Sequence, residues 1–226
     1  MFKAADLFDL AQTEHAALFD GCHYAWEALK KIDAYLAKVA WQTSPKAFPG
    51  AMIGERVIIG EGTVIEPGAM IKGPAIIGKN CQIRHNAYIR ENVIIGDGCV
   101  IGNSSELKNA LLFNGCQVPH FNYIGDSVLG YKAHTGAGVI CSNLKSLPGN
   151  VTLMVEGKPL DTGLRKFGAL IGDNAEVGCN SVLNPGSVIG CGATIYPGVS
   201  WRGFLPANNI AKNKADVEVV VKRSRS

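Results

Sequence analysis

The residues best suited to chemistry gather between positions 105 and 145. This stretch reads SELKNALLFNGCQVPHFNYIGDSVLGYKAHTGAGVICSNL and holds charged, aromatic and amide side chains that a repetitive β-fold does not need for packing. Histidine, with a reference pKa of about 6.5, takes up a proton near neutral pH, whereas lysine and aspartate are charged there. The side chains concerned are Lys108, His120, Phe121, Asn122, Tyr123, Asp126 and His134.

The elements that must position these side chains repeat every six residues. Six is a multiple of the two-residue period of a strand but not of the 3.6-residue period of a helix. Because Gly, Asn or Pro-Gly turns separate the aliphatic positions, the pattern predicts a parallel β-helix of hexapeptide repeats. The repeating positions are Ile53, Ile59, Ile65, Ile71, Ile77, Ile83, Ile89, Ile95 and Ile101, and later Ile171, Val177, Leu183, Ile189, Ile195 and Trp201.

The repeat slips inside the chemically rich stretch. Three hexads make one coil in the left-handed β-helix family, so we expect a mainly β, left-handed parallel β-helix of about seven coils. The spacing shortens to five residues twice, from Leu107 to Leu112 and from Ile124 to Leu129. A region where the local rule fails inside a regular fold is where a functional site is expected.

The domain organisation follows from where the hexads begin, pause and end. Residues 1–46 are predicted to form a short helical segment, with an amphipathic helix from His23, that packs on the first coil and caps its open sheet edge. The β-helix is placed at 47–204, with 146–168 extruded from it as a hairpin. Residues 205–226 are predicted to leave the β-helix as a tail, in which VEVVV (217–221) adds a last edge strand.

Composition excludes several classes of protein. The net charge of +3 over 226 residues is too small to indicate a nucleic-acid partner. No apolar run approaches the roughly 18 residues of a membrane span, and the N-terminus lacks the order of a signal peptide. The seven cysteines form no CxxC pair and are predicted to be reduced thiols, which favours the cytoplasm. Cys81, Cys99 and Cys116 are predicted to pack beside inward aliphatic positions.

The same stretch resembles a known enzyme family. It has an E-x-K element (Glu106 to Lys108), then P-H-x-x-Y-x-G-D-S over residues 119–127, then G-A-G and S-N-L. These motifs are similar to the acetyltransferase domain of the bifunctional N-acetylglucosamine-1-phosphate uridyltransferase/glucosamine-1-phosphate N-acetyltransferase family, and most similar to its archaeal-type branch. The resemblance covers about residues 23–204. It implies an enzyme that transfers the acetyl group of acetyl-CoA to an amino-sugar phosphate, most readily glucosamine-1-phosphate.

The resemblance also implies roles for individual residues. His120 would be the general base, and Glu106 would accept a hydrogen bond from its ring and hold its tautomer. Arg90 and Lys108 would bind the sugar 1-phosphate. The remaining implied residues are Tyr123, Asn143 and His134 for the sugar, and Ala137, flanked by Gly136 and Gly138, for the CoA arm and the thioester oxygen. Family members are trimers with sites between neighbouring subunits, so a homotrimer is expected.

The chain departs from the family pattern in three places. It carries no nucleotide signature of a uridyltransferase domain, so uridylyl transfer is not expected. Leu144 replaces a tyrosine, and the lysine that follows in the family is replaced by SLPGN. Candidates to replace that lysine are Lys145, Arg165 and Lys166.

Three other functions are compatible with the same fold. The protein could be an acyltransferase for another amino sugar or nucleotide sugar, or a non-catalytic scaffold. A γ-type carbonic anhydrase would need three histidines on a metal. His85, His120 and His134 are present, but the close histidine pair of that family is missing.

Overall fold

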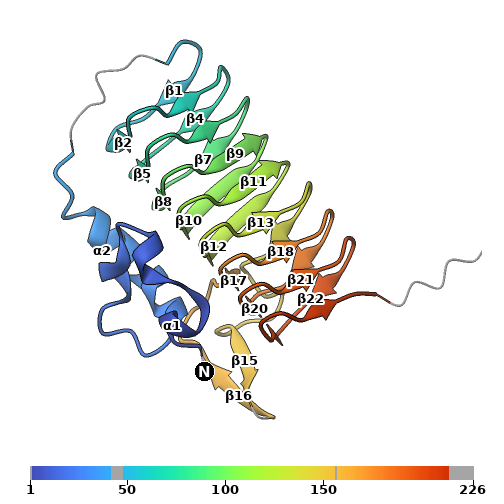
Figure 1. The fold of residues 1–226 in the computed structure, drawn as a ribbon. Helices are drawn as coiled ribbons and strands as arrows, with labels where there is room; N and C mark the ends of the chain where they lie inside the picture. The colour runs from blue at the N-terminus through green and yellow to red at the C-terminus, as the bar shows by residue number, and fades with distance from the viewer. Residues whose placement is uncertain (1, 42–47, 156, 214–226) are drawn as a thin grey trace, which may run out of the picture.

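The computed structural model describes residues 2–41, 48–155 and 157–213. Its main body is a parallel β-solenoid with three faces (Figure 1). The first face stacks β1 (Met52–Ile53), β4 (Met70–Ile71), β7 (Tyr88–Ile89), β10 (Glu106–Leu112), β12 (Tyr123–Leu129), β14 (Ile140–Cys141), β19 (Val182–Leu183) and β22 (Ser200–Trp201).

The other two faces are built in the same way. The second face stacks β2 (Val57–Ile59), β5 (Ala75–Ile77), β8 (Val93–Ile95), the distal halves of β10 and β12, β17 (Ala169–Ile171), β20 (Ser187–Ile189) and β23 (Phe204–Leu205). The third face stacks β3 (Val64–Ile65), β6 (Gln82–Ile83), β9 (Val100–Asn103), β11 (Gln117–His120), β13 (His134–Thr135), β18 (Glu176–Val177), β21 (Thr194–Ile195) and β24 (Ile210–Ala211).

The predicted fold class is confirmed, and the solenoid is longer than expected. The described part of each face carries eight strands, where the sequence predicted about seven coils. The predicted end of the β-helix at residue 204 is wrong, because β23 pairs with β20 and β24 pairs with β21. A four-residue step from Trp201 to Leu205 hid this last coil from the hexad count. The predicted strand at 217–221 lies outside the described residues.

The hexad positions point inward and form one continuous core. Ile89, Leu107 and Ile124 are stacked on successive rungs of the first face, and each is fully buried. Cys81, Cys99 and Cys116 are free thiols buried in the same core, as predicted. Their sulfur atoms donate hydrogen bonds to carbonyl oxygens of Gly96, Phe113 and Gly130, at 3.1, 3.1 and 3.0 Å.

The two five-residue steps have a direct structural cause. In β10 and β12 a single strand runs from the first face around the corner onto the second face, so one turn residue is lost in each coil. Asn109 and Asp126 form these corners, with φ of +46° and +47°. Asn and Asp tolerate this left-handed region better than other non-glycine residues. The slip therefore places two polar side chains at tight corners on adjacent coils.

The N-terminal segment packs against the side of the solenoid. The prediction that it packs on the first coil and caps its open sheet edge is wrong. It consists of α1 (Ala4–Leu7), 3₁₀-helices at Leu10–Gln12, Ala16–Phe19 and Ala25–Lys30, and α2 (Ile32–Leu36). The amphipathic helix predicted from His23 is thus divided between the last 3₁₀-helix and α2. Figure 1 shows these helices beside the middle coils. They share a hydrophobic cluster with outward side chains of the second face, which are Ile94, Leu111, Val128, Leu170 and Val188.

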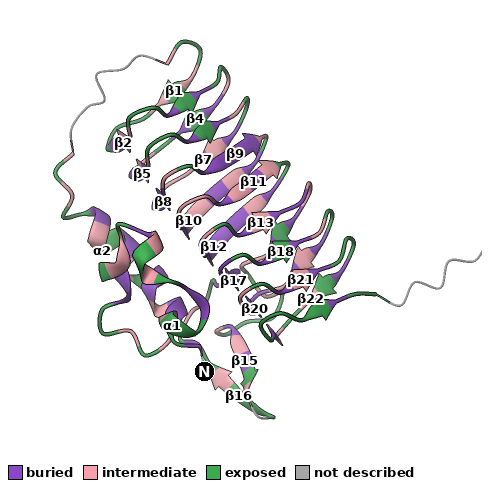
Figure 2. Ribbon diagram, in the orientation of Figure 1, coloured by how far each residue is buried: buried purple, intermediate pink, exposed green. Residues whose placement is uncertain are grey.

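This packing explains why the second face is apolar on both sides. Each of its outward positions is apolar, and five of them are fully buried under the segment or the neighbouring loops (Figure 2). Trp26, with 1% of its surface exposed, lies at the centre of the covering cluster. A strand whose side chains are apolar on both sides is expected to be buried on both sides. The core buries the inward side of these strands, and the N-terminal segment buries the outward side. No helix in the described ranges is both long and apolar enough to span a membrane.

Residues 146–168 leave the solenoid between β14 and β17. They contain β15 (Thr152–Val155) and β16 (Lys158–Asp161), which pair antiparallel (Figure 1). Val151 and Leu153 are buried in the cluster that holds the N-terminal segment. The chain re-enters the solenoid through Gly168, whose N–H donates to the carbonyl oxygen of Asp126 at 2.8 Å.

Candidate active site

The residues singled out from the sequence occupy two corners of the solenoid. The first corner joins the first face to the second, and holds Arg90, Lys108 and Asn143 after or within β7, β10 and β14. The second corner joins the third face to the first, and holds His120 at the end of β11. Between the two corners, Glu106 and Tyr123 lie side by side on the first face, as partners in the β10–β12 register. The first face therefore connects the two groups.

Asp126 is the centre of the first corner. Its side chain is 6% exposed, and its carboxylate forms an ion pair with the Lys108 ammonium at 3.2 Å. It also accepts hydrogen bonds from the side-chain amides of Asn109, at 2.9 Å, and Asn143. A buried carboxylate is retained only when it is paired and hydrogen-bonded, and these three donors meet that condition. Asp126 thus fixes two residues that the sequence assigned to sugar binding.

Tyr123 extends this network toward the first face. Its hydroxyl oxygen accepts a hydrogen bond from the Asn143 side-chain amide at 3.2 Å. Burial raises the pKa of Tyr123, and the negative charges of Asp126 and Glu106 raise it further. The phenol is therefore neutral at physiological pH and keeps its own proton to donate to a ligand.

Arg90 and Glu106 form a second pair, which is partly exposed. Arg90 Nη1 donates to Glu106 Oε1 at 2.9 Å, with side-chain exposures of 32% and 36%. This hydrogen bond raises the pKa of Arg90, so the guanidinium stays charged. Glu91 lies beside the pair, 3.4 Å from Arg90 and 3.6 Å from Lys72. An exposed pair of this kind contributes little to stability and leaves the guanidinium available to an anionic ligand.

His120 lies at the second corner with its side chain exposed. Its ring makes no hydrogen bond with any described residue, so the predicted bond from the His120 ring to Glu106 is absent and Glu106 is paired with Arg90 instead. The backbone of His120 nevertheless contacts the predicted CoA loop, because its carbonyl oxygen accepts the Gly138 N–H at 3.0 Å. His120 and residues 136–138 are therefore neighbours.

The loop at 136–138 presents one free backbone donor. The N–H groups of Gly136 and Gly138 donate to the carbonyl oxygens of Val177 and His120. The Ala137 N–H makes no such bond within the described part of the chain. His134 lies just before this loop, on β13 of the third face, paired in register with Gln117 and Glu176. The structure thus separates His134 from the Asp126 network.

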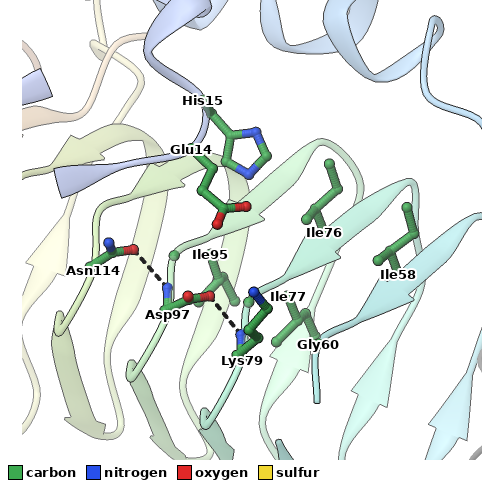
Figure 3. Close-up of a pocket in the computed structure, with 12 residues that line it drawn as sticks. Glu14, His15, Ile58, Gly60, Ile76, Ile77, Lys79, Ile95, Asp97 and Asn114 are labelled. Carbon is green, nitrogen blue, oxygen red and sulfur yellow. Dashed lines mark hydrogen bonds between the residues drawn. The ribbon is translucent and has the colours of Figure 1, made fainter. Parts of the chain in front are cut away.

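Described residues line a cavity on each of two sides of the solenoid. One, of about 340 Å³, adjoins the first corner and is lined by Ser142, Leu144, Lys145, Ser146, Leu147, Asn184, Pro185 and Arg202. The other, of about 160 Å³, lies between the N-terminal segment and the corner joining the second and third faces (Figure 3). There His15 and Glu14 face an aliphatic floor that includes Ile58 and Ile76, and His15 Nδ1 lies 2.9 Å from the Tyr35 hydroxyl.

No metal-binding group is formed by the described residues. Among residues 2–41, 48–155 and 157–213, no three His, Cys, Asp or Glu side chains are grouped so that they could hold a metal ion. His85, one of the three histidines considered above, is hydrogen-bonded through Nδ1 to the Pro67 carbonyl oxygen at 2.7 Å.

Comparison with known proteins identifies the relatives of this chain. The family model for the GMPPB C-terminal domain matches residues 71–157. The bifunctional protein GlmU of Methanococcus maripaludis strain C7 is 43% identical over 201 residues, which are 89% of this chain and 49% of that protein. The resemblance predicted from the sequence motifs is confirmed. The chain spans about half the length of this GlmU relative.

Two further matches complete the comparison. A bifunctional sugar-1-phosphate nucleotidylyltransferase/acetyltransferase of Sulfurisphaera tokodaii is 40% identical over 95 residues, which are 42% of this chain and 24% of that protein. Among solved structures, the UDP-N-acetylglucosamine acyltransferase from Campylobacter jejuni covers 73% of this chain and 66% of its own at 17% identity, with a TM-score of 0.35.

Two residues of the site had no role assigned from the sequence motifs. Asp126 and Asn109 hold the first corner together, although Asp126 is the last letter but one of the P-H-x-x-Y-x-G-D-S motif. The available signal was the five-residue step, which places both residues at shortened corners. Residues 17 apart meet there because the shortened coil has that length.

Proposed function

We propose that this protein is an acetyl-CoA-dependent N-acetyltransferase that acts on an amino-sugar phosphate, glucosamine-1-phosphate in the first instance. The observation that carries the proposal is the arrangement of the first face, where Arg90, Glu106, Lys108, Tyr123 and Asn143 occupy neighbouring rungs of a rigid solenoid. The similarity to bifunctional GlmU proteins and to a named sugar-1-phosphate nucleotidylyltransferase/acetyltransferase supports the same class of reaction.

In the proposed reaction the sugar amine attacks the thioester carbonyl carbon of acetyl-CoA. A C–N bond forms, the attacking nitrogen gives its proton to His120, and the C–S bond then breaks as CoA leaves and recovers a proton. The free, exposed ring of His120 is suited to this role, because no side chain of the described chain occupies its nitrogen atoms. The Ala137 N–H would stabilise the oxyanion that forms on the carbonyl oxygen.

The acceptor would be held by the first corner and the first face. Arg90 would contact the phosphate with two parallel N–H bonds, and Lys108 would add a second positive charge. Both cations are already balanced by carboxylates, Glu106 and Asp126. When phosphate binds, Arg90 would therefore give up part of its hydrogen bonding to Glu106 in favour of the phosphate. Glu106 would then be free to accept a hydrogen bond from the His120 ring.

We also propose that the chain works as a homotrimer, with His120 of one subunit close to a neighbouring subunit. Exposed apolar side chains on the first face support an interface there, since exposed apolar surface marks contact sites. Met52 and Met70, partners in register on β1 and β4, are 57% and 37% exposed, and Ile140 farther along the same face is 42% exposed.

The test is a thiol-release assay with acetyl-CoA and glucosamine-1-phosphate. His120→Ala is expected to lower kcat by about 10² or more, because a positioned general base contributes that much. His85→Ala is the matched control, since the His85 ring bonds to the Pro67 carbonyl oxygen on a neighbouring turn, away from the candidate site, and its rate should equal that of the wild type. Equal rates for His120→Ala and wild type would remove His120 from the mechanism, and no thiol release with any amino-sugar phosphate would favour the scaffold alternative.

A further inference from the structure

The cavity beside the first corner has no role in the reaction described above. It is formed by Ser142 and residues 144–147 after β14, by Asn184 and Pro185 after β19, and by Arg202 after β22. We refer to it as the Lys145–Arg202 cavity. Its volume of about 340 Å³ lies within the range of small-molecule sites.

The charge of the Lys145–Arg202 cavity is entirely positive. Lys145 and Arg202 are its only charged lining residues, and neither forms an ion pair or side-chain hydrogen bond in the described part of the protein. Lys166 adds a third cation at the edge, because it forms a β-bridge with Leu144. Unpaired Lys and Arg lining one cavity favour a phosphate, to which the guanidinium can make two parallel hydrogen bonds.

The uncharged lining is mixed, with polar Ser142, Ser146 and Asn184 beside apolar Leu144, Leu147 and Pro185. Leu144 is 46% exposed and Leu147 is 74% exposed, and Pro185 contributes to the same cavity. Exposed leucines around a concave site indicate a ligand that covers them. The ligand class is therefore one that joins phosphate to a flat or apolar body, which is the description of a nucleotide.

The walls of the cavity are fixed by the solenoid. The Asn184 side-chain amide donates to Ser200 Oγ and to the Trp201 carbonyl oxygen, each at 3.0 Å, and the Ser142 N–H donates to the Leu183 carbonyl oxygen at 2.9 Å. A site held by β-strands and their turns loses little entropy when it binds.

The position of the cavity connects it to the candidate active site. Asn143 lies between two of its lining residues, and the Asn143 side chain belongs to the Asp126 network. A ligand bound in the cavity would therefore extend from the point where the acceptor sugar is expected. Because the cavity adjoins the network but shares none of its charged residues, it offers a second phosphate position separate from Arg90 and Lys108.

We infer that the Lys145–Arg202 cavity binds the phosphate and base of a nucleotide, with the phosphate on Lys145 and Arg202 and the base on Leu144 and Leu147. The nucleotide could belong to a nucleotide-linked amino-sugar acceptor or to the adenosine end of acetyl-CoA, and only this choice of source rests on the proposed function. The binding itself does not require the protein to be an acetyltransferase.

The test measures binding of three probes to the full chain by isothermal titration calorimetry: UDP, adenosine 3′,5′-bisphosphate and inorganic phosphate. One of the two nucleotides should bind more tightly than inorganic phosphate. Tighter binding of UDP would indicate a nucleotide-linked acceptor, and tighter binding of adenosine 3′,5′-bisphosphate would indicate the adenosine end of acetyl-CoA. Lys145→Ala and Arg202→Ala should each raise the Kd for that nucleotide by about tenfold or more, because each removes a charged hydrogen bond. Leu147→Ser should raise the Kd for the nucleotide but leave the Kd for inorganic phosphate unchanged.

Two controls separate the proposal from its alternatives. Lys132→Ala, at an exposed lysine of another coil, should bind as the wild type does. His120→Ala should also retain full nucleotide binding, so a failure of the acetyltransferase proposal would leave this result intact. Absence of nucleotide binding, equal affinity for nucleotide and inorganic phosphate, or unchanged affinity in both cation variants would each overturn the inference.

Discussion

Replacement of Asp126 by asparagine tests the network at the centre of the candidate site. The carboxylate faces only donors: the Lys108 ammonium at 3.2 Å, the Asn109 amide at 2.9 Å and the Asn143 amide. Asparagine keeps the shape but turns one of the two acceptor oxygens into an NH₂ donor. At least one of the three donors then loses its acceptor, and the ion pair with Lys108 is lost.

The expected loss follows from these contacts. A hydrogen bond to a charged group contributes about 1.5–3 kcal/mol, and removal of one partner of a buried pair costs about 3–5 kcal/mol. Lys108 is 17% exposed and can regain part of this through water. We therefore expect Asp126→Asn to lower the free energy of unfolding by about 2–4 kcal/mol, which corresponds to about 5–15 °C in Tm for a chain of this size.

Thermal unfolding followed by circular dichroism measures this change. Asp33→Asn is the control, since Asp33 lies exposed in α2, and its Tm should stay within about 2 °C of the wild type. In the acetyl-transfer assay, Asp126→Asn should raise KM for the acceptor more than it lowers kcat, because Asp126 positions Lys108 and Asn143 and does not touch the reacting atoms. A Tm equal to that of the wild type would refute the argument that a buried, fully paired carboxylate organises this corner.

Two further predictions concern the N-terminal segment. Leu111→Ala should cost about 2–5 kcal/mol in urea unfolding, because Leu111 is fully buried beneath the segment; a loss below about 1 kcal/mol would show that the segment does not cover it. Burial lowers the pKa of His15, against the opposing charges of Glu14 and Asp97, so the folded state binds this proton less well than the unfolded state. Stability should therefore be constant above about pH 6.5 and fall as the pH decreases below it. His15→Gln should remove this fall in stability at low pH. Unfolding followed by Trp26 fluorescence at different pH values measures the change.

Much of the solenoid is readable from the sequence because its rules are local. Each hexad sets one strand and one turn, so Ile89 and Leu107 can be assigned to the core without knowledge of any distant contact. The P-H-x-x-Y-x-G-D-S motif likewise places His120 and Tyr123 on consecutive strands. The end of the solenoid was misplaced because the step from Trp201 to Leu205 breaks the local rule.

The placement of the N-terminal segment was not accessible in this way. Its apolar face, which includes Trp26 and Leu29, was evident, but a helix with an apolar face can cover any apolar surface. The partner surface was visible as the middle residues of repeats such as VII and ALL, including Ile94 and Leu111. Only the folded solenoid shows that these residues point outward together on one face and so need a cover.

The sequence by itself therefore determined the solenoid and the stretch that carries the chemistry, whereas the tertiary structure decided which side chains meet. Asp126 reaches Lys108 and Asn143 because they lie one coil away, at separations of 18 and 17 residues. A change of one residue in coil length would move the corner and separate these groups. Whether Glu106 contacts His120 or Arg90 was decided in the same way, by the direction in which neighbouring rungs present their side chains. Periodicity is a property of the chain, but contact across coils depends on how the coils stack.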